Sequence, residues 1–297
     1  MWRTGALLAA ALAIAAAATV ARLRFSTDGV VRRSATTAPP QRIISLAPGI
    51  TETCFALGLG DRLVGRTEHC DFPLQAHAIP AVGSLLDPNL EAIVALDPGL
   101  ILVARSGKDL RGRLDAIGLP YLALPNDKLD DVFASIHLIA ERCDCGAAGE
   151  RLTRALRQRV AVVRTAARGT APRRVLVSIS PSRVPMQAPY VAGPGSFLGS
   201  LIELAGHTVV PADLGRDYAE VPLESVVETN PDVIIEFRGL AGEPTALAAD
   251  PLTAWGTLPE LQAVRDRRVY VLHGTRYVIP GPRIVDTLEE LAALLRR

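Results

Sequence analysis

The feature that most constrains the fold is a segment that the chain repeats. Residues 88–103 read Pro-Asn-Leu-Glu-Ala-Ile-Val-Ala-Leu-Asp-Pro-Gly-Leu-Ile-Leu-Val, and residues 222–236 follow the same pattern at a constant offset of 133 residues (223 − 90). In each copy a short helix that begins with a glutamate ends before a proline, and the apolar run that follows is typical of a buried strand. Two similar helix–strand units predict two similar α/β lobes.

Length and composition set the class of protein. With 297 residues, of which 49% are hydrophobic and 21% charged, the chain can bury a large core in one or two domains. The net charge is +1, with acidic and basic residues interspersed, so no field of one sign favours nucleic acid or an anionic membrane surface as a partner. We therefore expect a globular protein that binds no nucleic acid. We also expect it to be a monomer.

The first 24 residues are typical of an export signal. Arg3 precedes an uncharged run over residues 5–21 that ends in Thr-Val-Ala, which suits a secretory signal with a small-residue cleavage site. The run also approaches the ~18 apolar residues that a membrane span needs, so an uncleaved anchor is the alternative. We expect a periplasmic protein, with residues 25–40, which are poor in apolar side chains, as a disordered linker.

One long helix is expected to join the two lobes. Residues 150–168 contain no glycine or proline, and Leu152, Leu156, Val160 and Val163 recur at helical spacing. We assign residues 41–146 to an N-terminal α/β lobe, 147–169 to a connecting helix of ~30 Å, and 170–297 to a C-terminal α/β lobe. The expected strands include 42–47, 63–65, 121–124, 174–179 and 268–272, and the expected helices include 110–117, 129–142, 196–205 and one that starts at Pro282. The predicted fold is two Rossmann-like lobes on a single backbone helix.

The cysteines do not form a recognised metal or redox motif. Cys54, Cys70, Cys143 and Cys145 could pair in three ways in an oxidising compartment, and the sequence does not choose among them. Cys143-Asp144-Cys145 lacks the two-residue spacing of such motifs, and the five histidines do not cluster. We expect structural cysteines, no metal site and no cofactor.

Ligands of open α/β sheets bind beyond the carboxyl ends of the strands, so a cleft between the lobes is the expected site. The loops expected there carry aromatic side chains and a few charges, which suits a large, partly apolar ligand. These residues are Arg66, His69, Phe72, Leu85, Tyr190, Tyr218, Trp255, Arg276 and Tyr277. Core packing is the more common role for a helix-flanking residue such as Trp255, whereas Tyr190 and Tyr218 adjoin loops with glycine or proline and are stronger candidates.

Several motifs, in order from Gln41 to the C-terminus, carry a family resemblance. They are Arg42-Ile-Ile-Ser-Leu-Ala-Pro-Gly-Ile-Thr-Glu52, Val64-Gly65 with Cys70-Asp-Phe-Pro73, Asn89-Leu-Glu91 before Asp97-Pro98, and residues 190–193. This part of the chain resembles the periplasmic binding proteins of iron-siderophore and cobalamin ABC importers. The resemblance implies the class III bilobal fold with one long helix, and delivery of a metal chelate to a dimeric permease without catalysis.

The resemblance also implies a docking role for two glutamates. In this family one glutamate on each lobe docks onto arginines of the permease, and Glu91 and Glu224 occupy those positions. The internal repeat singles out the same pair, and two carboxylates held apart by a rigid body suit a two-fold symmetric partner. The simpler alternative is that each glutamate complements the dipole of its helix, worth ~0.3–1 kcal/mol.

The ligand is less well specified than the family. The resemblance to cobalamin-binding members places Tyr190 and Tyr218 where aromatic residues line the corrin pocket, but His69 takes the place of a tyrosine and Leu85 that of a tryptophan. Thr275 and Ile279 likewise replace an aspartate and an arginine that contact the ligand. His69 would then either coordinate the metal or form a hydrogen bond.

A corrinoid is therefore the first expectation, and a ferric siderophore or haem is the alternative. For that second class of ligand, Arg66 and Arg276 would pair with acidic groups of the chelate.

A dinucleotide-dependent oxidoreductase is the more distant alternative. Residues 193–199, Gly-Pro-Gly-Ser-Phe-Leu-Gly, open a predicted helix and precede Asp213 by about 20 residues, as in the dinucleotide-binding fingerprint. A proline in the tight turn and a final spacing that is one residue too long argue against it. HExxH, GxSxG and P-loop patterns are missing from the sequence, so we expect no enzyme.

Overall fold

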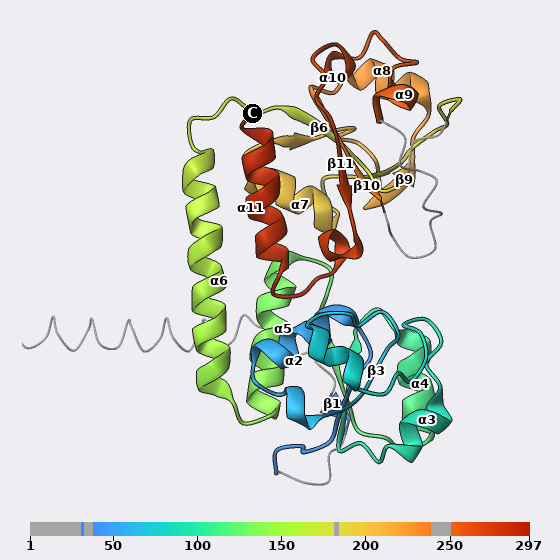
Figure 1. Cartoon of the computed structure of the whole chain (residues 1–297), viewed down its shortest axis with the longest axis vertical. Coiled ribbons are helices and arrows are strands. Elements are labelled where there is room, and N and C mark those ends of the chain that lie inside the picture. The colour runs from blue at the N-terminus through green and yellow to red at the C-terminus, as the bar shows by residue number, and fades with distance from the viewer. Residues whose placement is uncertain (1–30, 33–37, 181–183, 239–250) are drawn as a thin grey trace, which may run out of the picture.

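The computed structural model describes residues 31–32, 38–180, 184–238 and 251–297. These residues form two α/β lobes that lie one above the other, with one long helix along the side of both (Figure 1). One lobe contains the sheet β1-β5-β4-β2-β3, and the other contains the sheet β11-β10-β6-β7-β9, with β8 also paired to β6. The expected signal segment lies outside the described residues, and so does most of the expected linker.

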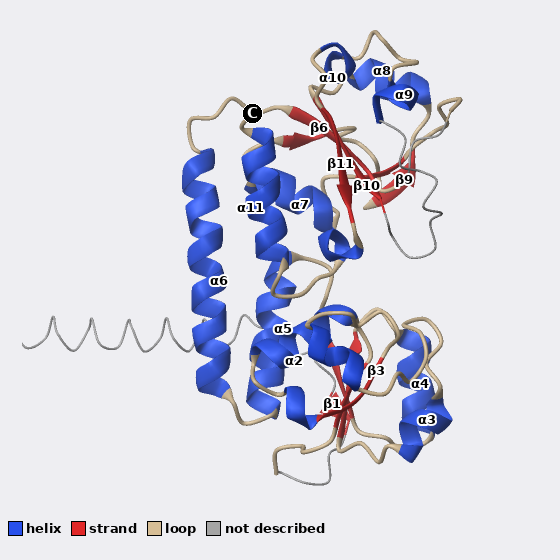
Figure 2. Ribbon diagram, in the orientation of Figure 1, coloured by secondary structure: helices blue, strands red, loops and turns tan. Residues whose placement is uncertain are grey.

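The N-terminal lobe has a buried parallel sheet covered by short helices (Figure 2). Its central strand β4 pairs in parallel with β2 on one side and β5 on the other. The strands are β2 (Ile43–Ser45), β3 (Leu63–Arg66), β4 (Leu100–Ala104) and β5 (Tyr121–Leu124), and the helices are α2 (Pro48–Ala56), α3 (Leu90–Ala95), α4 (Lys108–Ala116) and α5 (Leu129–Arg142). Two 3₁₀ turns, η1 (Gly60–Arg62) and η2 (Leu74–Ala78), complete the lobe.

A short strand at the edge of this sheet lies inside the segment that we expected to be disordered. Val31–Arg32 forms β1, which pairs antiparallel with β5 at Leu122 and Tyr121. Because β5 is paired with β4 on one side only, its other edge has backbone groups that need partners. The edge of β5 that β4 leaves open explains why a strand can form at these two residues.

The C-terminal lobe repeats the first sheet and extends it. The parallel order β11-β10-β6-β8 corresponds to β5-β4-β2-β3, so the repeat seen in the sequence is part of a repeat of whole lobes. The strands are β6 (Arg174–Ser178), β7 (Tyr190–Ala192), β8 (Thr208–Val209), β9 (Tyr218–Glu220), β10 (Val233–Arg238) and β11 (Val269–His273). The helices are α7 (Phe197–Leu204), α8 (Leu223–Thr229), α9 (Pro251–Trp255), α10 (Gln262–Arg265) and α11 (Ile284–Leu295), with the 3₁₀ turn η4 (Thr275–Val278). The antiparallel strands β7 and β9 were not predicted from the sequence.

Helix α6 (Gly146–Ala167) joins the lobes. Its 22 residues give a length of about 33 Å, and it runs beside α5 of one lobe and α11 of the other (Figure 1). Leu156, Val160 and Val163 are buried on its inner face. On the same helix, Arg159 donates at 2.6 Å to both Asp286 and Glu289 of α11. The predicted connecting helix is therefore present and is packed against both lobes.

No helix within the described ranges combines the length and the apolar character that a membrane crossing needs.

Candidate functional site

The carboxyl ends of both parallel sheets meet at one junction between the lobes. Strand β2 leads directly into α2, and a Cβ atom at Gly49 on this helix would overlap the backbone of Pro280, which follows β11 and η4 in the other lobe. A Cβ atom at Gly281 would in turn lie 3.0 Å from the Cα atom of Gly49. Segments that follow the two sheets are therefore in contact at this junction, without space for side chains at these glycines. The ligand cleft between the lobes stays a prediction.

Five of the nine predicted ligand residues are exposed. They are His69, Phe72, Leu85, Tyr190 and Arg276. Phe72 has 44% of its surface exposed and Tyr190 has 43%, which is unusual for aromatic side chains in a folded lobe. Exposed aromatic groups therefore occur in both lobes, on the loop after β3 and at the start of β7.

Two predicted tyrosines share one face of the added antiparallel strands. Tyr190 pairs with Glu220 and Tyr218 pairs with Ala192, and directly opposed residues point to the same side of a sheet. Tyr218 is partly buried, and this burial raises the pKa of its phenol, opposed by a hydrogen bond with Ser196 at the start of α7. The structure thus brings the two strongest sequence candidates together on one surface.

Arg66 has a structural role that its sequence position did not reveal. Its side chain is buried, and Nε donates to the carbonyl of Ala76 at 2.8 Å. Nη1 donates to the carbonyls of Thr67 and Glu68, both at 3.0 Å. The guanidinium therefore holds the shape of the loop that carries His69 and Phe72, and it is not placed to bind an anionic ligand.

Trp255 also lies inside its lobe. It is fully buried, and its indole Nε1 donates to Glu236 Oε2 at 3.0 Å. Glu236 is itself buried and is paired with Arg238 on the same strand. Core packing, which the sequence analysis noted as common for such a position, is the role that the structure gives to Trp255.

Tyr277 and Arg276 connect η4 to α11. Tyr277 is 3% exposed and donates from its hydroxyl to Glu290 Oε1 at 2.9 Å, and burial raises the pKa of this phenol. The Arg276 guanidinium donates to Glu290 Oε2 at 2.7 Å and lies 4.5 Å above the centre of the Tyr277 ring. Ligand contact by Tyr277 is not supported by its position, whereas Arg276 is exposed but already paired.

Glu91 and Glu224 lie at matching positions on the two lobes. Each is exposed in the first turn of a short helix, α3 or α8. The side chain of Asn89 caps α3 by accepting from the amide of Ala92 at 3.0 Å, whereas Pro222 precedes α8 without a side-chain cap.

A cavity of about 480 Å³ lies beside α8, between the loop after β8 and strand β9.

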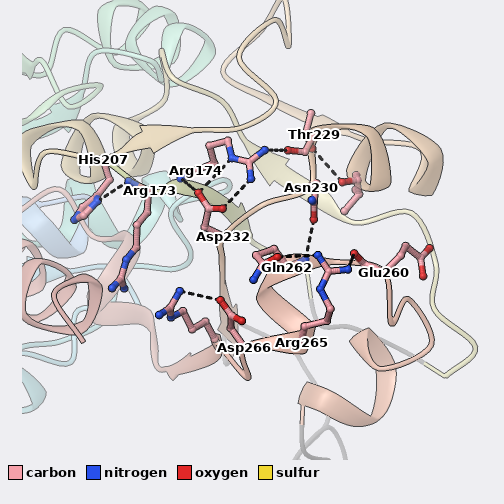
Figure 3. Close-up of polar contacts among 12 residues, drawn as sticks. Arg173, Arg174, His207, Thr229, Asn230, Asp232, Glu260, Gln262, Arg265 and Asp266 are labelled. Carbon is pink, nitrogen blue, oxygen red and sulfur yellow. Dashed lines mark hydrogen bonds and ion pairs between the residues drawn. The ribbon is translucent and has the colours of Figure 1, made fainter. Parts of the chain in front are cut away.

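In each lobe an arginine at the start of a strand, β2 or β6, binds the helix–strand repeat beside it. Arg42 donates to the carbonyl of Leu96 at 2.6 Å at the end of α3. Arg174 donates to Asp232 at 2.8 Å and to the carbonyl of Thr229 at 3.0 Å (Figure 3). The Arg174 hydrogen bonds lower the pKa of the Asp232 carboxyl.

The cysteines and histidines do not form a metal site in the described part of the chain. All four cysteines are free thiols; Cys54, Cys70 and Cys143 are buried, and Cys145 is partly buried. Burial raises the pKa of the Cys143 thiol to about 11, which favours the unreactive protonated form.

An ion pair that was not predicted from the sequence crosses the junction. Glu52 of α2 and Arg283, which precedes α11, are in contact although they are 231 residues apart. The sequence signal that could have suggested this pair is that Glu52 is the one charged residue of α2, because a carboxylate is seldom buried without a partner.

Comparisons with known proteins place these features in a family. The family model for "Periplasmic binding protein" matches residues 43–275. The vitamin B12-binding protein of Vibrio cholerae serotype O1 is 28% identical over 260 residues, which cover 87% of this chain and 90% of that protein. The crystal structure of the periplasmic vitamin B12-binding protein of Vibrio cholerae has a TM-score of 0.75 at 28% identity, covering 87% of this chain and 97% of that one. A structure described as an ABC-type Fe³⁺-hydroxamate transport system, from Saccharomonospora viridis, has a TM-score of 0.66 at 30% identity, with 88% and 94% covered.

The family model spans well over half of the chain, and the similar proteins cover nearly all of the two lobes. Proteins of this family bind a solute for transport and carry out no catalysis, so the oxidoreductase alternative is wrong. The chain belongs to the periplasmic binding protein family, and it is the substrate-binding component of an ABC importer.

Proposed function

We propose that this chain captures a corrinoid between its two lobes and delivers it to a permease from the periplasm. The observation that carries the proposal is the similarity, over nearly the whole of both lobes, to vitamin B12-binding proteins. The exposed aromatic side chains of Phe72 in one lobe and Tyr190 in the other support it.

The chemistry of the exposed loops suits a large macrocycle. Phe72 from one lobe and Tyr190 and Tyr218 from the other offer aromatic surface, and Leu85 adds an exposed apolar group. Aromatic rings bury a large area at a low cost in conformational entropy, which favours a broad ligand with apolar faces and polar edges. A small ion or sugar would leave most of this apolar surface in water.

His69 is the group that would recognise the metal of the chelate. Its imidazole is exposed, and it lies three residues from Phe72 in the loop that Arg66 holds in shape. Neutral imidazole is a good ligand for cobalt or iron, and a hydrogen bond to the edge of the macrocycle is the alternative role.

A ferric chelate is the second candidate ligand, supported by the similarity to the Fe³⁺-hydroxamate transport protein. In that case Arg276 would bind an acidic group of the chelate. It would first have to leave Glu290, to which it donates at 2.7 Å. We therefore rank the corrinoid first.

The partner of the loaded protein in this proposal is a permease dimer. Glu91 and Glu224 are both exposed, and each lies on its own lobe in the first turn of a matching helix. A rigid body with one carboxylate on each lobe can meet an arginine on each of two symmetric subunits, which fixes its orientation.

The ligand surface is tested by truncating its aromatic groups. We expect Phe72→Ala and Tyr190→Ala each to weaken cyanocobalamin binding about tenfold, because each removes a large apolar contact. Equilibrium dialysis follows the coloured ligand directly. Val162→Ala, at an exposed apolar residue on α6, is the matched control and should bind like the parent protein.

Unchanged cyanocobalamin binding in both variants would contradict the proposed surface. Loss of affinity for a ferric hydroxamate but not for cyanocobalamin in Arg276→Ala would move the assignment to the second candidate.

A further inference from the structure

One ion pair joins the two lobes directly at the junction. Nη2 of Arg283, in the C-terminal lobe, donates to Oε1 of Glu52 on α2 of the N-terminal lobe at 2.5 Å. The Glu52 side chain is 3% exposed and that of Arg283 is 25% exposed. Neither residue of this pair, which we call the interlobe tie, belongs to α6.

The same guanidinium also contacts the proposed ligand loop. Its Cζ atom lies 3.8 Å from the centre of the Phe72 ring, within the range in which a cation is attracted to an aromatic face. Arg283 therefore binds a carboxylate on α2 and covers a ring on the loop after β3. A planar guanidinium can do both, whereas a lysine ammonium is a compact point charge.

The backbone next to the tie leaves no space for a side chain at residue 281. A Cβ atom at Gly281 would lie 2.9 Å from Glu52 Oε2 and 3.0 Å from the Cα atom of Gly49. Oε2 is buried and has no hydrogen-bond partner among the described residues, so Glu52 depends on Arg283 for its charge compensation.

The charges around Glu52 agree with this dependence. Burial raises the pKa of Glu52, the nearby Asp286 carboxylate raises it further, and Arg283 opposes both. Without the guanidinium, Glu52 would be either a buried uncompensated carboxylate or a neutral acid, and Phe72 would lose the group that covers its ring.

We propose that Arg283 is a positioning residue for the ligand loop, which it holds through Phe72 at a fixed place relative to both lobes. The inference rests on the proposed function for its effect on ligand affinity. Its effect on Phe72 does not depend on which ligand is bound.

The first test therefore uses no ligand. In a Phe72→Trp variant, the new indole reports its own exposure through quenching of its fluorescence by acrylamide, after subtraction of the parent signal from Trp2 and Trp255. We expect Arg283→Gln to raise the quenching constant of residue 72 about twofold, because the cation no longer covers the ring. Arg154→Gln, at an exposed position on α6, is the matched control and should leave it unchanged.

The second test is a double-mutant cycle with cyanocobalamin. We expect Arg283→Gln to weaken binding about tenfold in the parent protein and less than twofold in Phe72→Ala, because the arginine acts through the ring. Arg283→Lys keeps the positive charge but lacks the planar guanidinium, so its loss of affinity should lie between those of the parent and Arg283→Gln. A purely structural role would give the same loss in both backgrounds.

Equal quenching with and without Arg283 would overturn the inference, whatever the ligand. If the quenching result holds but neither cyanocobalamin nor a ferric hydroxamate binds the parent protein, the proposed function fails and the positioning of Phe72 stands.

Discussion

The two repeats keep the same backbone geometry and use different side chains to hold it. Asp97 and Asn230, at the offset of the sequence repeat, both adopt the left-handed conformation, with φ of 43° and 41°. Each is followed by a proline and then by a central strand of the sheet. Aspartate and asparagine tolerate this conformation better than most residues, which explains the match.

The two lobes differ in how the arginines Arg42 and Arg174 bind the repeats. Arg42 donates to the backbone carbonyls of Leu96 and Asp97, whereas Arg174 donates mainly to the carboxylate of Asp232. Asn230 also accepts from the amide of Gln262 at 2.7 Å, a contact that reaches α10 (Figure 3). What the two lobes share is thus the path of the chain and the exposed glutamate, while the supporting polar contacts have diverged.

The largest expected effect concerns the shared glutamates. We expect the double charge reversal Glu91→Arg with Glu224→Arg to reduce ligand import more than tenfold. In the proposed complex, each lobe would then repel the arginine of the permease subunit that it faces. Import into cells or vesicles that contain the cognate permease measures the effect. Cyanocobalamin binding by the purified variant is the control and should not change.

The single reversals sharpen the comparison between the lobes. Equal losses from Glu91→Arg and Glu224→Arg would agree with a symmetric partner. Normal import by the double variant would show that these carboxylates only complement their helices.

A smaller effect is expected from removal of the two tying arginines. Arg174→Ala leaves Asp232 without its guanidinium and should lower the free energy of unfolding by roughly 1–2 kcal/mol. Arg42→Ala exposes carbonyl groups that water can satisfy, so its cost should be about 0.5 kcal/mol. Urea unfolding of both variants measures the difference, and a larger loss for Arg42→Ala would contradict the contrast between the lobes.

The smallest expected effect is on the pH dependence of stability. The folded-state pKa of Asp232 lies below its ordinary value of 3.8, so its contribution is present above that value and is lost as the pH falls through the folded pKa. Stability of the parent protein relative to Asp232→Asn should therefore decrease below about pH 4, by less than about 1 kcal/mol because the pair is partly exposed.

The matched measurement in the other lobe uses Arg42→Ala, whose carbonyl partners do not titrate. Its stability relative to the parent should stay constant over the same pH range. If the difference in the free energy of unfolding between the parent and Asp232→Asn did not change with pH, the interaction of Arg174 with residue 232 would not depend on the charge of the carboxylate.

Much of the architecture could be predicted from the sequence because it depends on local patterns. Strand β5 and helix α5 have the predicted bounds, and α6 differs from the assigned connecting helix by a residue or two at each end. Apolar spacing, glycine stops and proline starts act over a few residues, so they are visible in one sequence. Strands β7 and β9 were missed because each has only three residues. They form through non-local pairing, β7 with β6 and β9 with β7.

The candidate site was less predictable because side-chain placement depends on contacts between distant segments. Arg66 ends strand β3, Trp255 ends α9 and Tyr277 lies in η4, yet their side chains lie inside the lobes. Arg283 was not singled out because its two partners, Glu52 and Phe72, are in the other lobe. Sequence patterns locate the loops, and only the packing of the lobes shows which side chains remain exposed.

The most direct test of the account is calorimetric titration of the purified protein with cyanocobalamin, cobinamide, haemin and a ferric hydroxamate. We predict tight binding of one corrinoid per chain, and weaker or no binding of the iron chelates. Binding of a ferric hydroxamate or haemin without binding of either corrinoid would contradict the assignment of a corrinoid as the ligand.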